Sequence, residues 1–206
     1  MNPRTTLTLC NGKGIDLLAP TVADIDFDVI AEHLAKDNRY CGATRGLTYS
    51  VAEHSVRCAD AALRATNDGT LAAYLLCHDM HEAFFGDDTT PKKRALAEIA
   101  AANFGVLHEE ILSMFELTID RMDAAIHAAA GLPWGPTREQ VQAIKHWDRV
   151  LLATEWKFLM RCPPPYAFGV EPLSEPIDPM DWEDAAYTFK QRCEALLPRF
   201  TQGAGA

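Results

Sequence analysis

The sequence predicts an all-α protein, a single-domain helical bundle with a small N-terminal β-hairpin. Three observations lead to this fold class. Apolar residues recur at helical spacing along most of the chain, residues that commonly cap helices precede these stretches, and one alternating stretch lies near the N-terminus. The length of 206 residues suits one domain, and a hydrophobic content of 48% is ordinary for a soluble globular protein.

Residues 1–20 are expected to form a β-hairpin extension. Thr6–Cys10 alternates between polar and apolar residues, Asn11–Gly14 has the composition of a turn, and an apolar run resumes at Ile15. Pro20 then ends the segment. Because a two-stranded hairpin is only marginally stable alone, it should lie on the helical body.

Capping signals mark where the helices begin. Asp26 is a candidate N-cap, and the pairs Ser50 with Glu53 and Thr137 with Gln140 fit the capping box, in which the two side chains satisfy each other's backbone N–H groups. The expected helices cover residues 27–36, 50–64, 70–85, 94–130 with a break near Gly105, 137–160 and 178–198.

One domain, 1–206, is expected to include the whole chain, with its helical core over residues 27–160. A proline-rich loop over 163–177 follows the core. An aspartate–proline pair then supplies an N-cap and a first-turn proline for the C-terminal helix 178–198. The residues from Thr201 onward are expected to fray.

Charge and cysteine content limit the possible functions. The formal charge of −10 argues against nucleic-acid binding, which requires a basic surface, and against anionic membranes. The chain shows no signal peptide and no apolar run of transmembrane length, so a cytoplasmic location is expected. The six cysteines are expected to be reduced and mostly buried. An anionic substrate would need positive charge from a metal ion or from local arginine and lysine side chains.

Four residues on three expected helices are candidate metal ligands: His54, His78, Asp79 and Asp148. Each one alone is more often a structural or surface residue. Their joint pattern is more specific, because a histidine in an early helical turn is followed 24 residues later by His-Asp, and an isolated aspartate lies in a late apolar helix. Mixed His/Asp ligation suits one divalent ion, but it does not distinguish Co²⁺, Mn²⁺, Zn²⁺, Fe²⁺ and Mg²⁺.

Two acidic residues follow the His-Asp pair. In a continuous helix Glu82 would lie at i+4 from His78 and i+3 from Asp79, so the three side chains would converge. Gly86 offers a helix stop, which leaves Asp87 at the edge of the site. The other histidines are interpreted as bystanders: His33, His108 and His127 as surface or capping groups, and His81 and His146 on other helix faces.

Basic and aromatic residues lie near these acidic groups in the sequence. Arg39 and Tyr40 occupy a glycine-containing connection, where a guanidinium group could bind phosphate and a ring could stack on a base. Lys92 and Lys93 follow Asp87 closely and could neutralise phosphate oxygens. Solvated surface is the alternative interpretation of these residues.

Together these motifs resemble the HD-domain metal-dependent phosphohydrolases, and most closely the bacterial HD 5′-deoxynucleotidases. The resemblance spans residues 38 to 160. It rests on three groups of motifs, namely Asn38-Arg39-Tyr40 with Ala52 to Ser55, His78-Asp79 with Glu82 through Gly86-Asp87 and Thr90-Pro91, and Lys145 with Asp148.

The resemblance implies an all-α HD-domain helical bundle in which His54, His78, Asp79 and Asp148 hold one divalent metal ion. It also implies that Glu82 and Asp87 lie near the attacking water and the substrate. Arg39 would contact phosphate, and Tyr40 would pack by the nucleoside, at a position where relatives carry tryptophan. That substitution leaves the base preference open.

The expected function is metal-dependent hydrolysis of a phosphate ester in a small nucleotide, with a deoxynucleoside 5′-monophosphate as the favoured substrate. Glu82 or Asp87 would accept the proton of the attacking water. A triphosphohydrolase and a non-catalytic nucleotide-binding module are the alternatives. A homodimer is a further expectation, because dimers are common in the family.

Overall fold

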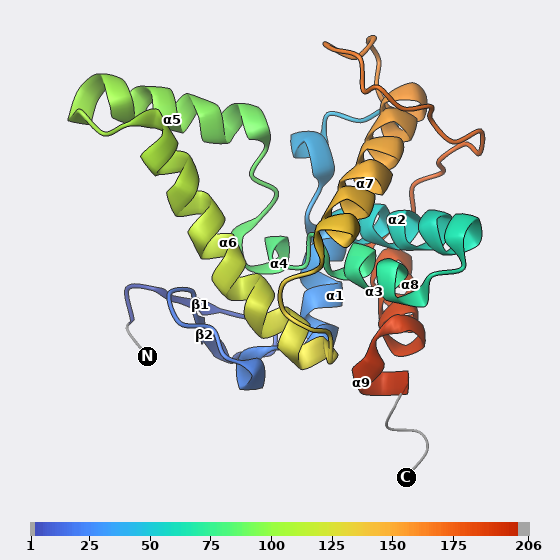
Figure 1. The fold of residues 1–206 in the computed structure, drawn as a ribbon, viewed down its shortest axis with the longest axis horizontal. Coiled ribbons are helices and arrows are strands. Elements are labelled where there is room, and N and C mark those ends of the chain that lie inside the picture. The colour runs from blue at the N-terminus through green and yellow to red at the C-terminus, as the bar shows by residue number, and fades with distance from the viewer. Residues whose placement is uncertain (1–2, 202–206) are drawn as a thin grey trace.

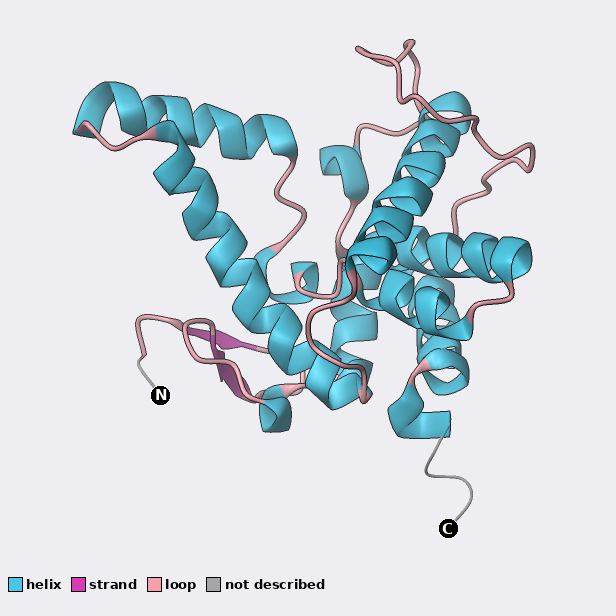
Figure 2. Ribbon diagram, in the orientation of Figure 1, coloured by secondary structure: helices cyan, strands magenta, loops and turns pink. Residues whose placement is uncertain are grey.

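The computed structural model describes residues 3–201, and it confirms the prediction of an all-α protein with a small hairpin (Figures 1 and 2). The α-helices of the described residues are α1 (Phe27–Lys36), α2 (Val51–Thr66), α3 (Gly69–Cys77), α4 (Glu82–Phe85), α5 (Thr90–Phe104), α6 (His108–Ala130), α7 (Arg138–Leu159), α8 (Trp182–Leu196) and α9 (Pro198–Thr201). None of these helices is long and apolar enough to cross a membrane.

The N-terminal hairpin pairs β1 (Thr6–Thr8) with β2 (Gly14–Asp16) in an antiparallel ladder. Ile15 of β2 is fully buried and belongs to the main hydrophobic core. A second contact ties the hairpin to α6, because Arg121 of α6 donates to the carbonyl of Leu18, just after β2. The expectation that the hairpin lies on the helical body is therefore confirmed.

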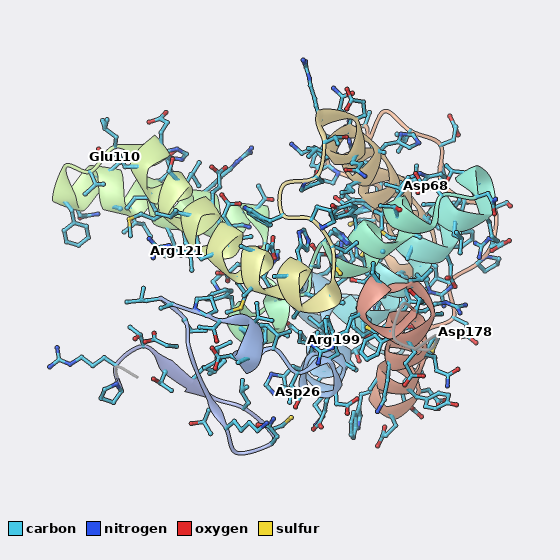
Figure 3. The ribbon with its side chains drawn as sticks, turned by 60° about the horizontal axis from the view of Figure 1, so that its bottom comes forward. Asp26, Asp68, Glu110, Arg121, Asp178 and Arg199 are labelled. Atoms are coloured by element: carbon cyan, nitrogen blue, oxygen red, sulfur yellow. The ribbon has the colours of Figure 1, made fainter. Side chains whose placement is uncertain are left out.

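The core forms where α1, α2, α3 and α8 pack together, and α7 lies across α2 and α3. Fully buried residues from several of these helices fill it, among them Leu34, Leu75, Leu76 and Phe189. Local caps begin the helices as expected: the side chain of Asp26 accepts from Asp28 at the start of α1 (Figure 3). Both predicted capping boxes, at α2 and α7, are also present.

Helices α5 and α6 form an arm that projects from the body (Figures 1 and 2). Gly105 separates them with a left-handed φ of +65°, a conformation that glycine adopts without steric cost. The C-terminal half of α6 is anchored in the core by Met122 and Ile126, which are fully buried. Arg199 of α9 also donates to the Ala129 carbonyl of α6 (Figure 3). The N-terminal half of α6 is more exposed.

The single helix expected over 70–85 is wrong, because α3 ends at Cys77 and α4 begins at Glu82. Residues 78–81 form tight turns in which N–H groups bond to carbonyls three residues back, as in a 3₁₀-helix. The physical reason lies in a side chain. The ring Nδ1 of His78 is 2.6 Å from the Leu75 carbonyl, the acceptor that the next backbone N–H would need in an α-helix.

The C-terminal helix also begins later than expected. Its N-cap is Asp181 rather than Asp178, because the preceding segment bonds to α2: the Asp178 carbonyl accepts from Arg57, and the Met180 N–H donates to Glu53. The proline-rich stretch 163–177 contains no helix or strand, as expected. The fraying tail was expected to begin at Thr201, which instead ends α9, and the rest of that tail lies outside the described residues.

Candidate metal centre

The fold brings the four candidate ligands together from three parts of the chain. His54 lies in the first turn of α2, His78 and Asp79 follow α3, and Asp148 lies in the middle of α7. The Nε2 atom of His54 is 3.3 Å from His78 Nε2, 3.3 Å from Asp148 Oδ1 and 3.6 Å from Asp79 Oδ2. The Nε2 atom of His78 is 3.2 Å from the same Asp79 oxygen.

Both imidazole rings are oriented by a hydrogen bond at Nδ1. The Nδ1 atom of His54 is 2.6 Å from Glu155 Oε1, and that of His78 is 2.6 Å from the Leu75 carbonyl oxygen. Because these partners are acceptors, each ring donates from Nδ1 and presents its Nε2 lone pair to the shared centre. This is the arrangement in which histidines bind metal ions, with the second ring nitrogen held by a carboxylate or a carbonyl.

The ligand atoms fit a cation of ordinary size. Metal–ligand distances of about 2.0–2.2 Å place neighbouring ligand atoms about 3–3.5 Å apart, which matches the observed separations. Two nitrogen lone pairs and two carboxylates cannot bond to one another without protons or a cation between them. Burial opposes the charged form of His54, yet Glu155 and Asp148 are among the neighbours that raise its pKa well above its ordinary value. A divalent cation would supply the positive charge that these carboxylates favour at the centre.

Cys58 adds a sulfur to this group. It lies one helical turn after His54, and its Sγ atom is 3.5 Å from His54 Nε2. His54, Cys58 and His78 form a buried set of ligand atoms within 4.8 Å of one another, and this set could hold a metal ion. Burial raises the pKa of the Cys58 thiol, so the carboxylates are the readier ligands. The sequence had indicated Cys58 only as a buried thiol.

The cysteines as a whole are not mostly buried, and that expectation is wrong. Cys58, Cys77 and Cys193 are buried, whereas the other three, Cys10, Cys41 and Cys162, are exposed, and all six are free thiols. The three buried thiols lie on core helices, where a small apolar side chain packs well.

Glu155 connects the metal centre to its surroundings, and sequence reasoning missed it. Its side chain is fully buried. One carboxylate oxygen bonds His54, and the other accepts from Tyr40 Oη at 2.5 Å and from Arg39 Nε at 3.3 Å. The available signal was its spacing, because Glu155 lies two helical turns after Asp148 and therefore shares its helix face.

Arg39 and Tyr40 lie beside the centre, in a 3₁₀ segment (Arg39–Gly42), and both bond to protein groups there. Arg39 is largely buried, and its Nη1 is 3.4 Å from Asp79 Oδ2. Tyr40 adopts a left-handed φ of +58°, and its ring packs edge-on against Trp156. These contacts make Tyr40 a support for Glu155 and leave its expected packing by a nucleoside without structural backing.

Glu82 is a half-buried acid close to the other acidic groups. Its Oε2 atom is buried and has no hydrogen-bond partner among the described residues. Burial, together with the charges of Asp79 and Asp87, raises the pKa of Glu82 to about 10. Burial also raises the pKa of Asp87, whose backbone N–H donates to Asp37 Oδ2 at 2.8 Å. Without a cation nearby, Glu82 therefore holds its proton at neutral pH.

This pKa predicts a specific dependence of stability on pH. The ordinary pKa of a glutamate is near 4.5, and that of Glu82 in the folded state is about 10. Between these two pH values the folded state keeps a proton that the unfolded state has lost, so rising pH should destabilise the metal-free wild-type protein. The variant Glu82→Gln lacks this titration. Its free energy of unfolding relative to wild type should increase steadily from about pH 5 to pH 9, measured by urea unfolding in EDTA. A difference that stays constant with pH would contradict the assignment.

The two candidate lysines have different surroundings. Lys92 is exposed and pairs with Asp88 one turn earlier on the chain, at the start of α5. Lys93 is half-buried and lines a cavity of about 320 Å³ that also borders Glu82. Of the two, Lys93 is therefore the one placed to face a molecule next to Glu82.

One of the bystander histidines, His127, is not a surface or capping group, which corrects that expectation. His127 is buried against the rings of Tyr74 and Trp134, and burial lowers its pKa. The Nδ1 atom of His33 is 2.8 Å from the Ala83 carbonyl, which links α1 to α4. The other three histidines make contacts away from the four candidate ligands. His81 pairs with Asp123 of α6. His146 is exposed beside Trp147, and His108 lies 3.6 Å from Glu98.

Comparisons with known proteins leave the family open. No protein-family model matches the chain. An uncharacterized protein of Rhodobacter capsulatus is 37% identical over 148 residues, which cover 69% of this chain and 66% of that protein. The chain thus matches just under two thirds of that relative's length. The likeness shows that related sequence exists in another protein and carries no activity with it.

Proposed function

We propose that this protein is an HD-type metal-dependent phosphohydrolase that cleaves the phosphate ester of a small nucleotide. A deoxynucleoside 5′-monophosphate is the substrate that the sequence resemblance favours. One observation carries the proposal: four ligand atoms from α2, the α3–α4 turn and α7 converge beside Glu82, whose buried Oε2 atom has no partner among the described residues. A structural metal site would not need this additional acid.

His54, His78, Asp79 and Asp148 would hold the ion, and their chemistry fits a divalent metal. When bound, such an ion supplies a Lewis acid for phosphoryl oxygen and lowers the pKa of water. Glu155 fixes the His54 ring in the orientation that leaves Nε2 free. The chain's own residues thus orient the two histidine ligands before any substrate arrives.

Glu82 is the proposed general base. The Glu82 carboxylate lies close enough to Asp79 for the charge of Asp79 to raise the pKa of Glu82. A bound cation would favour the ionised form of Glu82. Glu82 would accept the proton as a water oxygen bonds to phosphorus and the bond from phosphorus to the nucleoside oxygen breaks, and it would then give that proton to the leaving oxygen, so that nucleoside and phosphate are released. Asp87 lies in the same acidic group and is the second candidate for contact with the water or the leaving oxygen.

Local cations are needed because the protein carries a formal charge of −10. Arg39 is bonded to the ligand Asp79, so its guanidinium group lies at the centre's edge and could neutralise phosphate oxygens there. Lys93, which borders the cavity next to Glu82, is the other proposed cation. Lys92, paired with Asp88 at the surface, is the weaker candidate.

A nucleotide panel tests the function. Protein loaded separately with Co²⁺, Mn²⁺, Zn²⁺, Fe²⁺ and Mg²⁺ should release inorganic phosphate from deoxynucleoside 5′-monophosphates. Protein from which the metal has been removed with a chelator should not. Release of triphosphate from deoxynucleoside triphosphates would instead identify a triphosphohydrolase. Nucleotide binding without any hydrolysis, in every metal, would contradict the proposal and favour a non-catalytic binding module.

A further inference from the structure

A cavity of about 320 Å³ lies where the arm meets the body, between α4, the start of α5 and the N-terminal half of α6. Figure 1 shows α4 inside the angle that α5 and α6 make with the body. The cavity wall is mainly apolar, with Phe85 from α4 and Ile111, Met114, Phe115 and Ile119 from α6.

The apolar wall belongs to a stripe along α6 that the protein leaves partly uncovered. Ile111, Phe115, Ile119 and Met122 follow one another at helical spacing on one face. Met122 is fully buried in the core, but the three earlier residues are only half-buried. Helix α5 packs against α6 but leaves these three residues half-buried, and Ala97 is the only buried residue of α5 among those described. The stripe therefore continues as the wall of an open cavity.

The cavity adjoins the candidate metal centre through Glu82. This residue lines the cavity, and its backbone N–H donates to the carbonyl of Asp79, one of the candidate ligands, at 3.0 Å. A molecule in the cavity can therefore extend past Glu82 to the reacting centre. Tyr40, the residue expected to pack by the nucleoside, does not line this cavity and has its hydroxyl bonded to Glu155.

Polar groups at the cavity edge narrow the chemical class of the occupant. Thr118 donates its hydroxyl to the Met114 carbonyl, which leaves the hydroxyl oxygen as an acceptor. The Nδ1 atom of His81 is occupied by Asp123, and Lys93 and Asp88 also line the cavity. A heteroaromatic base has flat apolar faces and a hydrogen-bonding edge, so it matches both surfaces. An acyl chain would offer no hydrogen-bonding group to the Thr118 hydroxyl oxygen or to Lys93.

We propose that this cavity binds the heteroaromatic base of the substrate, with the rings of Phe85 and Phe115 against its faces. The inference rests on the proposed function, because it assigns the base of the nucleotide whose phosphate lies at the metal centre. It transfers base recognition from Tyr40 to the arm, and residues of α6 then set base preference.

The first test measures binding without phosphate chemistry. Metal-free protein with ¹³C-labelled methionine and isoleucine methyl groups is titrated with deoxyadenosine. The signals of Ile111, Met114 and Ile119 should shift saturably, while those of Ile177 and Met180, which border another cavity, should not. Absence of shifts on the arm at saturating nucleoside, or saturable shifts confined to Ile177 and Met180, would overturn the proposal.

The second test compares two substrates. Phe115→Ala and Thr118→Val should raise KM for deoxyadenosine monophosphate by about tenfold or more, because stacking and edge contacts are lost, with kcat changed by less than about twofold. Hydrolysis of glycerol phosphate, which has no base, should be unchanged. Leu117→Ala is the matched control, since Leu117 lies on the same helix, is 54% exposed and does not line the cavity. Equal effects on both substrates would contradict base binding.

Failure of this inference is distinguishable from failure of the proposed function. If deoxyadenosine shifts the arm methyl groups but no nucleotide is hydrolysed in any metal, the base site stands and the hydrolase assignment fails. If nucleotides are hydrolysed, but Phe115→Ala and Thr118→Val have the wild-type KM for nucleotides of every base, the hydrolase assignment stands and the base site fails. The unchanged Ile177 and Met180 signals report that each variant is folded.

Discussion

Glu82→Gln is expected to reduce kcat for phosphate release by about a hundredfold or more while metal binding is retained. Glutamine has nearly the same shape but cannot accept a proton from water. Glu82 is not one of the four converging ligands, and its Oε2 atom has no partner among the described residues, so the ligand set should survive the change. Steady-state phosphate release and calorimetric metal titration measure the two quantities on the same preparation.

The matched control for this prediction is Glu98→Gln. Glu98 lies on α5, and its side chain is 78% exposed, so the same chemical change there should leave kcat and metal affinity as in wild type. Glu82→Gln that loses the metal would make Glu82 a ligand. A variant that keeps full turnover would remove Glu82 from the reaction and leave Asp87 as the remaining candidate base.

Glu155→Gln is expected to weaken metal binding by about ten- to a hundredfold, although Glu155 is not a candidate ligand. The carboxylate holds His54 at Nδ1 and also bonds Arg39 and Tyr40. Removing its charge leaves the largely buried Arg39 with one ion-pair partner fewer, which should lower the free energy of unfolding by about 3 kcal/mol. Metal titration and urea unfolding measure the two effects.

A control for this variant exists on the same helix. Glu139→Gln replaces an exposed glutamate in the first turn of α7 and should change stability by less than about 0.5 kcal/mol, with no change in metal affinity. If Glu155→Gln destabilised the fold but bound metal as tightly as wild type, Glu155 would support Arg39 and Tyr40 without orienting His54.

Helix starts were predictable because their signals are local. Asp26, Ser50 and Thr137 each accept a backbone hydrogen bond from two or three residues ahead, so the sequence contains both partners within one turn. The break after Cys77 and the late start of α8 were not predictable in this way. The first depends on a histidine ring taking a helix carbonyl, and the second depends on bonds between the segment before α8 and distant residues of α2.

The residues of the candidate site likewise fall into those that the sequence indicated and those that only the structure showed. His54, His78, Asp79 and Asp148 were identified by residue type and order, and the structure brings their ligand atoms together; their role as ligands stays a prediction. Glu155 and Cys58 were missed because each looks like an ordinary residue of an apolar helix until α2 and α7 pack against each other. The cavity beside Glu82 involves α6, which had given no sign of a role.

The sequence by itself determined the all-α class, most helix starts and the chemical types gathered at the centre, because periodicity and caps act within a few residues. Only the tertiary structure decided which acid orients His54, which acid has a buried oxygen without a partner among the described residues, and that the arm leaves a cavity next to it. These properties depend on desolvation and on contacts between residues up to 116 positions apart, such as Arg39 with Glu155, and neither can be read from local sequence.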